Sequence, residues 1–361
     1  MRIWPAFLFY CLIGIAYAAP DIVLRNGLIY DGTGRAPFRG DVAIEKGRVI
    51  AIGDVTKAGV PAKVIDVNGL AIAPGFIDVH THAENITQHP KAENFLRMGV
   101  TTLVLGNCGS SKLKLGKFFT KLEQSGFSPN IASLIGHGTI RKQIMGGSFR
   151  RPPSTLELAD MQSLVDQAMR EGALGMSTGL IYLPGVFART DELVALSKIV
   201  SSHGGLYVSH MRSEGTNIFK AVDEVFMIAT RAKLPVHISH LKLAGRPMWG
   251  KHKELLARLD RARAGGIRLT HDQYAYTASS TSLRQLLPDD MVVGGSAEFS
   301  KRMSDPKTHE KTISWMKGRI RARQREDYSY AVIALHKKDP RYNGLNVVQA
   351  AKLRFGQGTL D

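Results

Sequence analysis

The chain has 361 residues, of which 44% are hydrophobic and 22% charged, values typical of a globular protein that can bury a core. Its 48 Lys and Arg against 31 Asp and Glu give a net charge of +17, which favours an anionic substrate. The sequence has neither zinc-finger spacing nor an RNA-binding signature, so we do not expect it to bind nucleic acid. Two cysteines, Cys11 and Cys108, are too few for a disulfide scaffold.

The first residues predict an export signal. Arg2 precedes an apolar run, Ile3–Ala16, which is too short for a membrane span and leads into the small-residue spacing of a signal-peptidase site, Ala16-Tyr17-Ala18. We expect residues 1–19 to be removed as a signal peptide, leaving a periplasmic or secreted protein without a stable membrane anchor. The alternative is a buried N-terminal helix.

Residues 20–72 have the pattern of a small β domain. Short apolar runs are separated by the turn-forming pairs Asn26-Gly27, Asp31-Gly32 and Lys46-Gly47. We expect a small antiparallel sheet here, the N-terminal half of a composite sheet.

Residues 73–361 alternate between strand and helix patterns. Apolar side chains recur at helical spacing from Met161 to Met169 and from Ile218 to Ala229. Such alternation predicts a parallel α/β domain, here a TIM-like (β/α) barrel. The expected strands are Leu70–Val79, Thr102–Leu105, Asn130–Ile135, Leu174–Ser177, Leu206–Ser209, Val236–Ser239 and Arg268–Tyr274. Because residues 284–361 are helical and basic in pattern, we expect the barrel to lack its eighth strand.

A histidine pair ends the first of these strands, in Pro74-Gly-Phe-Ile-Asp-Val-His80-Thr-His82. Residues two apart on a strand point the same way, so both imidazoles can reach one metal ion. Taken alone, the pair could also be two polar residues at a strand end.

Three later strands are followed by further candidate ligands. Cys108 lies in Gly106-Asn107-Cys108-Gly109, His210 ends Tyr207-Val-Ser-His, and His240 ends Val236-His-Ile-Ser-His. The alternatives are an inert buried cysteine and satisfied core histidines. We assign the core role to His237, which strand alternation sends to the opposite side from His240. Together with the histidine pair, these residues form a ligand set suited to zinc.

The chain resembles the N-acyl-D-amino-acid deacylases (D-aminoacylases) of the metal-dependent amidohydrolase superfamily. The resemblance runs over residues 21–361. It is carried by the histidine-pair and cysteine motifs together with Gly136-His-Gly-Thr-Ile-Arg141, Gly172-Ala-Leu-Gly-Met-Ser-Thr-Gly-Leu-Ile-Tyr182, Ser209-His-Met-Arg-Ser-Glu214, Ile238-Ser-His-Leu-Lys242 and Tyr274-Ala-Tyr-Thr-Ala-Ser-Ser280.

The resemblance implies roles for individual residues. Cys108, His210 and His240 would hold the tighter zinc, and His80 and His82, with Cys108 bridging, a second and weaker site. The substrate pocket would be lined by Tyr182, Lys242, Tyr274 and Ser280, the last three near the substrate carboxylate. A lysine with hydroxyl groups can bind such an anion. Without the resemblance, Lys242 could equally be a solvated lysine at a strand end.

The family also places an essential aspartate on the eighth strand, which would lie beyond Asp361. We therefore assign no catalytic residue in this chain and expect an inactive or weakly active fragment, or else a genuinely shortened protein. Asp272 matches a different family position, and Asp78 is expected to be a supporting or structural group.

The resemblance implies a zinc-dependent hydrolase of the linear amide bond in N-acyl-D-amino acids, which releases a carboxylate and a D-amino acid. The alternatives are a D-dipeptidase, a cyclic-amide hydrolase, or a catalytically dead metal-binding fragment. Cyclic-amide hydrolases bridge their metals with a carboxylated lysine on strand four, whereas Leu174-Gly-Met-Ser177 contains no lysine. The oligomeric state stays open.

Overall fold

The computed structural model describes residues 19–358, so the predicted signal peptide lies outside the described residues except for Ala19. The chain divides into two compact units, Met1–Phe76 and Ile77–Asp361.

The first unit is built around one five-stranded sheet. Its elements are β1 (Ile22–Ile29), β2 (Phe38–Glu45), β3 (Arg48–Gly53), η1 (Thr56–Ala58), β4 (Lys63–Asp66) and β5 (Ala71–Ile72). The pairs β1–β2 and β2–β3 are antiparallel, but β4 and β5 both run parallel to β1. The prediction of an antiparallel sheet is therefore wrong for β4 and β5. Residues 54–62 carry the chain from the end of β3 to the start of β4, which runs in the same direction as β1.

Two of the turn-forming pairs have different structural roles. Lys46 and Gly47 both have positive φ, 48° and 71°, and form the two-residue hairpin between β2 and β3. Asn26 also has positive φ, but it lies inside β1, where the register against β2 shifts between Leu24 and Gly27. This pair is therefore a bulge within one strand rather than a break between two strands.

The second unit contains the predicted parallel strands. Three strands form the sheet β6-β7-β8 and five form the sheet β13-β12-β11-β10-β9, with parallel pairing in every pair from β7 onward. The strands are β6 (Phe76–Asp78), β7 (Val100–Leu105), β8 (Asn130–Ser133), β9 (Ile135–Gly136), β10 (Gly175–Gly179), β11 (Leu206–His210), β12 (Val236–Ile238) and β13 (Leu269–His271). The predicted mixed α/β class is confirmed.

The predicted strand Leu70–Val79 is in fact two strands. Ala71–Ile72 pairs with β1, and Phe76–Asp78 forms β6 beside β7. Pro74 lies between them, and a proline cannot donate the backbone hydrogen bond that a continuous ladder needs.

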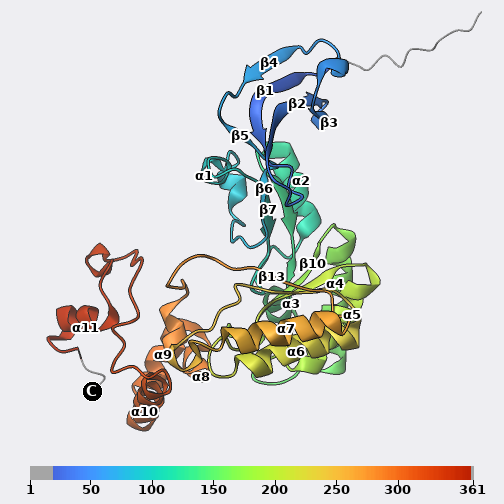
Figure 1. Ribbon diagram of the computed structural model, residues 1–361. Helices are drawn as coiled ribbons and strands as arrows, with labels where there is room; N and C mark the ends of the chain where they lie inside the picture. Colours follow the sequence, from blue (N-terminus) through green and yellow to red (C-terminus); the bar gives the residue numbers. More distant parts are fainter. Residues whose placement is uncertain (1–18, 359–361) are drawn as a thin grey trace, which may run out of the picture. The chain divides into compact units, whose positions relative to one another are not determined.

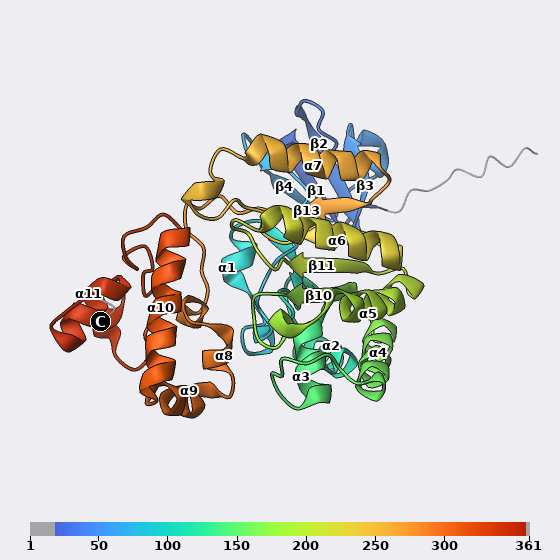
Figure 2. The same cartoon turned by 90° about the horizontal axis from the view of Figure 1, so that it is seen from below.

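Helices alternate with these strands. Helix α5 packs on β10 and β11, α6 on β12 and α7 on β13, as Figure 1 and Figure 2 show from two directions. The bounds are η2 (Ile86–Gln88), α1 (Glu93–Leu96), α2 (Leu115–Ser125), α3 (His137–Met145), α4 (Thr155–Arg170), η3 (Gly185–Phe187), α5 (Thr190–Ser202), α6 (Ile218–Ala232), η4 (Arg246–Met248) and α7 (His252–Ala264).

The predicted helical periodicities mark the core-facing sides of α4 and α6. Met161 and Val165 of α4 and Val222 and Val225 of α6 are buried in one large apolar cluster with the strands. Ser154 begins α4 with a capping box, in which its side chain accepts from the backbone N–H of Glu157. Packing of these faces against the sheet fixes the carboxyl ends of the strands, where the candidate ligands lie.

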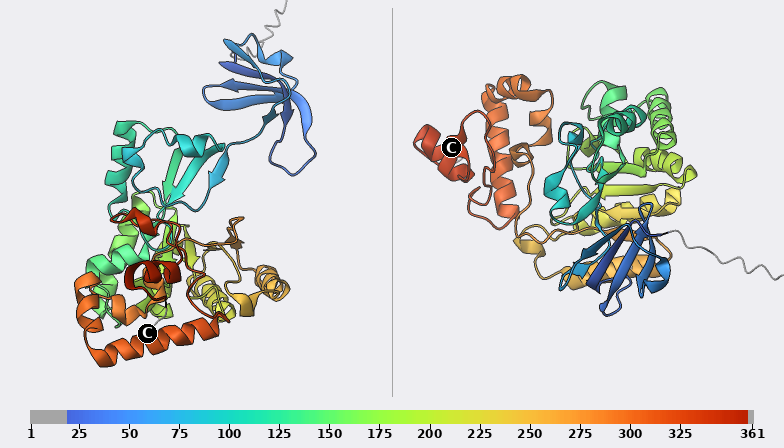
Figure 3. Two further views of the ribbon diagram at one scale, coloured as in Figure 1. Left: turned by 90° about the vertical axis from the view of Figure 1, so that its left-hand side faces the viewer. Right: turned by 90° about the horizontal axis from the view of Figure 1, so that it is seen from above.

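The chain after β13 is helical, as the sequence pattern predicts. It contains η5 (Leu283–Leu286), α8 (Asp289–Val292), α9 (Gly295–Met303), α10 (Pro306–Ala322), η6 (Pro340–Tyr342) and α11 (Val347–Phe355), drawn from orange to red in Figure 3. Within residues 19–358 no helix is both long enough and apolar enough to span a membrane.

Candidate metal centre

Cys108 lies in a tight turn directly after β7. It has a φ of 53°, in the left-handed region that non-glycine residues rarely adopt, and it stands between Gly106 and Gly109, whose φ values are 78° and 76°. A Cβ on Gly106 would lie 2.1 Å from the carbonyl oxygen of Leu134. The close approach of these segments therefore requires glycine and aims the Cys108 thiol at the strand ends.

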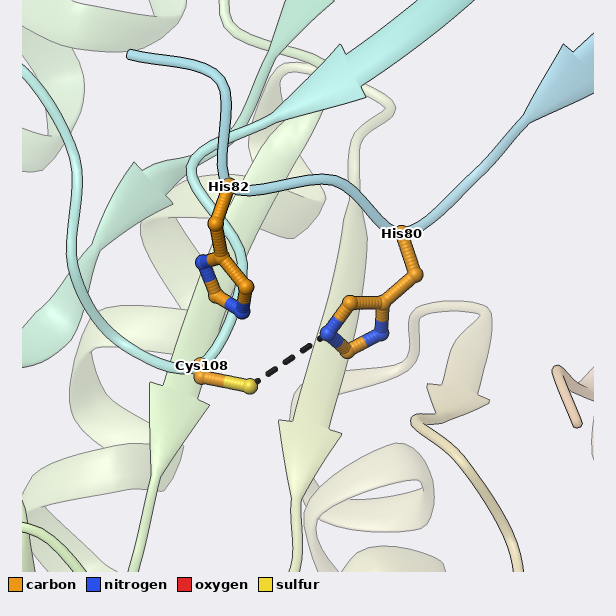
Figure 4. Close-up of side chains that lie close together, drawn as sticks. All are labelled: His80, His82 and Cys108. Atoms are coloured by element: carbon orange, nitrogen blue, oxygen red, sulfur yellow. Dashed lines mark hydrogen bonds between the residues drawn. The ribbon is translucent and has the colours of Figure 1, made fainter. Parts of the chain in front are cut away.

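His80 and His82 lie close to this thiol, as Figure 4 shows. Nε2 of His80 is 3.4 Å from Sγ of Cys108, and the ring centroids of the two histidines are 5.4 Å apart. The ligand atoms of all three side chains lie within 4.8 Å of one another. Both histidines follow the end of β6 at Asp78, so strand alternation is not the reason that they face the same point; the chain bends there instead.

His210 and His240 approach the same sulfur from the other sheet. Sγ of Cys108 is 3.6 Å from Nδ1 of His210, the last residue of β11, and 3.8 Å from Nε2 of His240, two residues beyond β12. Their ligand atoms form a second group within 4.8 Å that shares Cys108 with the first.

The spacing of these atoms fits a tetrahedral zinc ion. With Zn–S near 2.3 Å and Zn–N near 2.0 Å, a sulfur and a nitrogen ligand of one ion should lie about 3.5 Å apart. The three sulfur–nitrogen distances to His80, His210 and His240 are 3.4, 3.6 and 3.8 Å. One thiol with imidazoles is also a donor set that zinc prefers.

Burial shifts the pKa values of three candidate ligands, His82, Cys108 and His210. Burial and then electrostatic repulsion from His240 lower the pKa of His210 to about 3, and burial also lowers the pKa of His82, which keeps the imidazoles of His210 and His82 neutral. Burial, followed by the charges of Asp272 and Glu214, raises the pKa of Cys108 to about 12. A thiolate at this position therefore needs a cation beside it, and a bound metal ion supplies one.

Two carboxylates that the sequence left without a role support the histidines. Oε1 of Glu214 accepts hydrogen bonds from Nδ1 of His240 at 2.6 Å and from Nζ of Lys242 at 2.5 Å. Burial acts to raise the pKa of Glu214, but the hydrogen bond from His240 and the charge of Lys242 outweigh it and lower the pKa.

Asp272 is the second of these carboxylates. It accepts from Nδ1 of His80 at 3.1 Å and from Nε2 of His237 at 2.9 Å. Burial acts to raise its pKa, but the hydrogen bonds from His237 and His80 outweigh burial and lower it. The sequence contained one signal for this residue, since Asp272 directly follows a strand, where a barrel gathers its reactive groups.

His237 is the satisfied histidine that its pattern predicts. It is buried, and its Nδ1 pairs with Oγ1 of Thr270 at 2.7 Å while its Nε2 donates to Asp272. Both ring nitrogens are therefore engaged away from Cys108.

Three of the four predicted substrate-binding residues lie beside the ligand histidines, and the fourth is exposed. Nζ of Lys242 lies 5.2 Å over the ring of Tyr274, next to His240. Tyr182 packs against His210 and pairs with Oγ1 of Thr281 at 3.2 Å, and it lines a pocket of about 700 Å³ together with His82 and Cys108. Ser280 is exposed in the segment after β13.

Comparison with known proteins gives the family. The Amidohydrolase family matches residues 63–317. The chain belongs to this family. It is 36% identical over 289 residues to a D-aminoacylase of Alcaligenes xylosoxydans xylosoxydans, an alignment that covers 73% of this chain and 59% of that protein. The chain therefore spans about 59% of that relative's length.

Solved structures agree with the sequence match. A D-aminoacylase crystal structure has a TM-score of 0.77 and 29% identity, over 94% of this chain and 68% of that chain. The N-acyl-D-glutamate deacylase of Bordetella bronchiseptica, complexed with zinc and a phosphonate inhibitor, has a TM-score of 0.77 and 27% identity, over 95% of this chain and 69% of that one. The predicted resemblance to the D-aminoacylases is confirmed.

Proposed function

We propose that this protein is a zinc-dependent hydrolase of the linear amide bond in N-acyl-D-amino acids. The observation that carries the proposal is the position of Cys108 between two pairs of histidines, with sulfur–nitrogen distances to His80, His210 and His240 that suit zinc. The relatives named above supply the substrate class, since they are a D-aminoacylase and an N-acyl-D-glutamate deacylase.

The metal and the protein contribute different parts of the chemistry. A bound zinc ion would polarise the amide carbonyl and lower the pKa of a water molecule. Glu214 accepts from His240 and Asp272 accepts from His80, which orients each imidazole with its other nitrogen toward Cys108. Lys242 presents the ammonium group that we assign to the substrate carboxylate, with Tyr274 beneath it.

Asp272 and Glu214 both accept hydrogen bonds that support the candidate ligands, so we assign neither of them the role of taking a proton from water. Asp272 accepts from two imidazoles and a backbone N–H, and Glu214 accepts from His240 and Lys242. We therefore assign no general base within residues 19–358. The proposal for this chain is zinc and substrate binding, with turnover low at most.

Zinc content and stereoselective binding test the proposal together. The purified chain should retain zinc after dialysis, and the zinc-loaded chain should bind N-acetyl-D-leucine more tightly than N-acetyl-L-leucine or N-acetyl-D-leucinamide in calorimetry. A chain that holds no zinc contradicts the proposal. A chain that holds zinc and binds none of these compounds supports the alternative of a metal-binding protein without deacylase function.

A further inference from the structure

The carboxylate of Asp272 is the meeting point of three segments of the chain. It receives hydrogen bonds from Nδ1 of His80 at 3.1 Å, from Nε2 of His237 at 2.9 Å and from the backbone N–H of His240 at 2.5 Å. Its side chain is only 13% exposed, so water competes little for these contacts.

The backbone of Asp272 also holds the segment that contains His240. Its N–H donates to the carbonyl of Ile238 at 3.1 Å, and its carbonyl accepts from the N–H of Leu241 at 3.0 Å. Between these two contacts lies His240, whose φ of 37° is in the left-handed region. A non-glycine residue persists in that conformation only when its surroundings hold it there.

We propose that Asp272 is a positioning residue that builds both ligand groups at once, by orienting the ring of His80 in one and the backbone of His240 in the other. The inference rests on the proposed zinc site. Because a carboxylate accepts, Nδ1 of His80 carries the proton, and Nε2 keeps the lone pair that faces Sγ of Cys108 at 3.4 Å.

Two neighbouring carboxylates provide matched controls. Glu214 contacts the ring of His240, which belongs to the ligand group that does not contain His80, so Glu214 supports one group only. Asp78 belongs to the same segment as His80, but it accepts from the backbone N–H of His80 at 3.1 Å rather than from the ring. The variants Asp272→Asn, Glu214→Gln and Asp78→Asn therefore remove one negative charge each from distinct positions.

The first experiment measures zinc binding by each folded variant, with calorimetry and metal analysis after dialysis. Loss of a carboxylate that supports a metal ligand typically weakens metal binding about 10- to 100-fold. We expect Asp272→Asn to weaken every zinc-binding step of the wild type. Glu214→Gln and Asp78→Asn each alter the support of one ligand group only, so each should weaken one step at most. A folded Asp272→Asn chain with wild-type zinc affinity and stoichiometry contradicts the inference, whereas a wild-type chain that binds no zinc contradicts the proposed function.

The second experiment needs no metal and no altered Asp272. In metal-free wild-type protein labelled with ¹⁵N-histidine, the His80 signal, identified by its loss in His80→Gln, should report a proton on Nδ1. If Asp272→Asn fails to fold, the position of the His80 proton in the wild type alone tests the inference. A wild-type His80 that carries its proton on Nε2 overturns the inference, even where zinc binding is intact.

Discussion

The thiol of Cys108 lies 3.4 Å from Nε2 of His80, although 28 residues separate them in the chain. The same sulfur belongs to a second group with His210 and His240. One thiol thus joins two sets of imidazoles that come from different sheets, and the proposed metal centre depends on it more than on any single histidine.

The Lys242 assignment predicts weaker substrate binding when its charge is removed. A hydrogen bond to a charged group contributes about 1.5–3 kcal/mol, so Lys242→Met should bind N-acetyl-D-leucine on the order of 10- to 100-fold less tightly. Calorimetry on the zinc-loaded chain measures this effect. Lys117→Met, an exposed lysine of α2, is the control. Equal affinity in the Lys242 variant and the wild type would show that the carboxylate binds elsewhere.

A buried ion-pair triad predicts sensitivity to acid. Glu192 accepts from Nε2 of His137 at 2.7 Å and from Nε of Arg141 at 3.0 Å, and all three residues are buried. Burial acts to raise the pKa of Glu192, but the hydrogen bond and charge of His137 and the charge of Arg141 outweigh it and lower the pKa. Since the folded pKa lies below the unfolded value of about 4.3, this stabilisation is full above pH 4.3 and is lost as the pH falls through the folded pKa.

The variant Glu192→Gln tests that sign. At pH 7 it should lower the free energy of unfolding by roughly 3–5 kcal/mol, because it leaves the Arg141 charge buried without its partner. Urea unfolding at pH 7, 5, 4 and 3 should show the difference from the wild type shrinking below about pH 4. Glu123→Gln, an exposed glutamate of α2, should change little at any pH. A difference that grows toward low pH would contradict the account.

The ligands could be predicted from the sequence, whereas their supports could not. His80, Cys108, His210 and His240 each follow an apolar strand, and the carboxyl ends of parallel strands gather in one place. Glu214 gave no such signal and Asp272 gave only its position after a strand, because the role of both comes from pairing with side chains far away in the chain. Likewise, the apolar pattern of Leu70–Val79 showed a strand but not that Pro74 divides it between two sheets.

Asp272 and Glu214 support the ligand histidines, and because we assign neither as general base, we expect little turnover by this chain. We expect release of D-leucine from N-acetyl-D-leucine near background, since removing a general base typically costs on the order of 10²–10⁴ in rate. A coupled D-amino-acid assay on the zinc-loaded chain measures it. Robust hydrolysis would show that a carboxylate within residues 19–358 takes the proton, and Asp272 would be the first to replace.

We also propose that the protein is exported. The spacing Ala16-Tyr17-Ala18 predicts cleavage that leaves an N-terminus at about Ala19 or Pro20. Mass spectrometry of protein recovered outside the cytoplasm measures this directly. Recovery of an intact chain beginning at Met1 in the cytoplasm would refute export.

The metal content of Cys108→Ala tests the central claim most directly. The wild-type chain and the variant are purified in parallel, shown to be folded by circular dichroism, dialysed and analysed for zinc, with Cys108→Ser as a milder change. Because Cys108 belongs to both ligand groups, we predict that Cys108→Ala loses most of the bound zinc. A folded Cys108→Ala chain with the zinc content of the wild type would contradict the proposed metal centre.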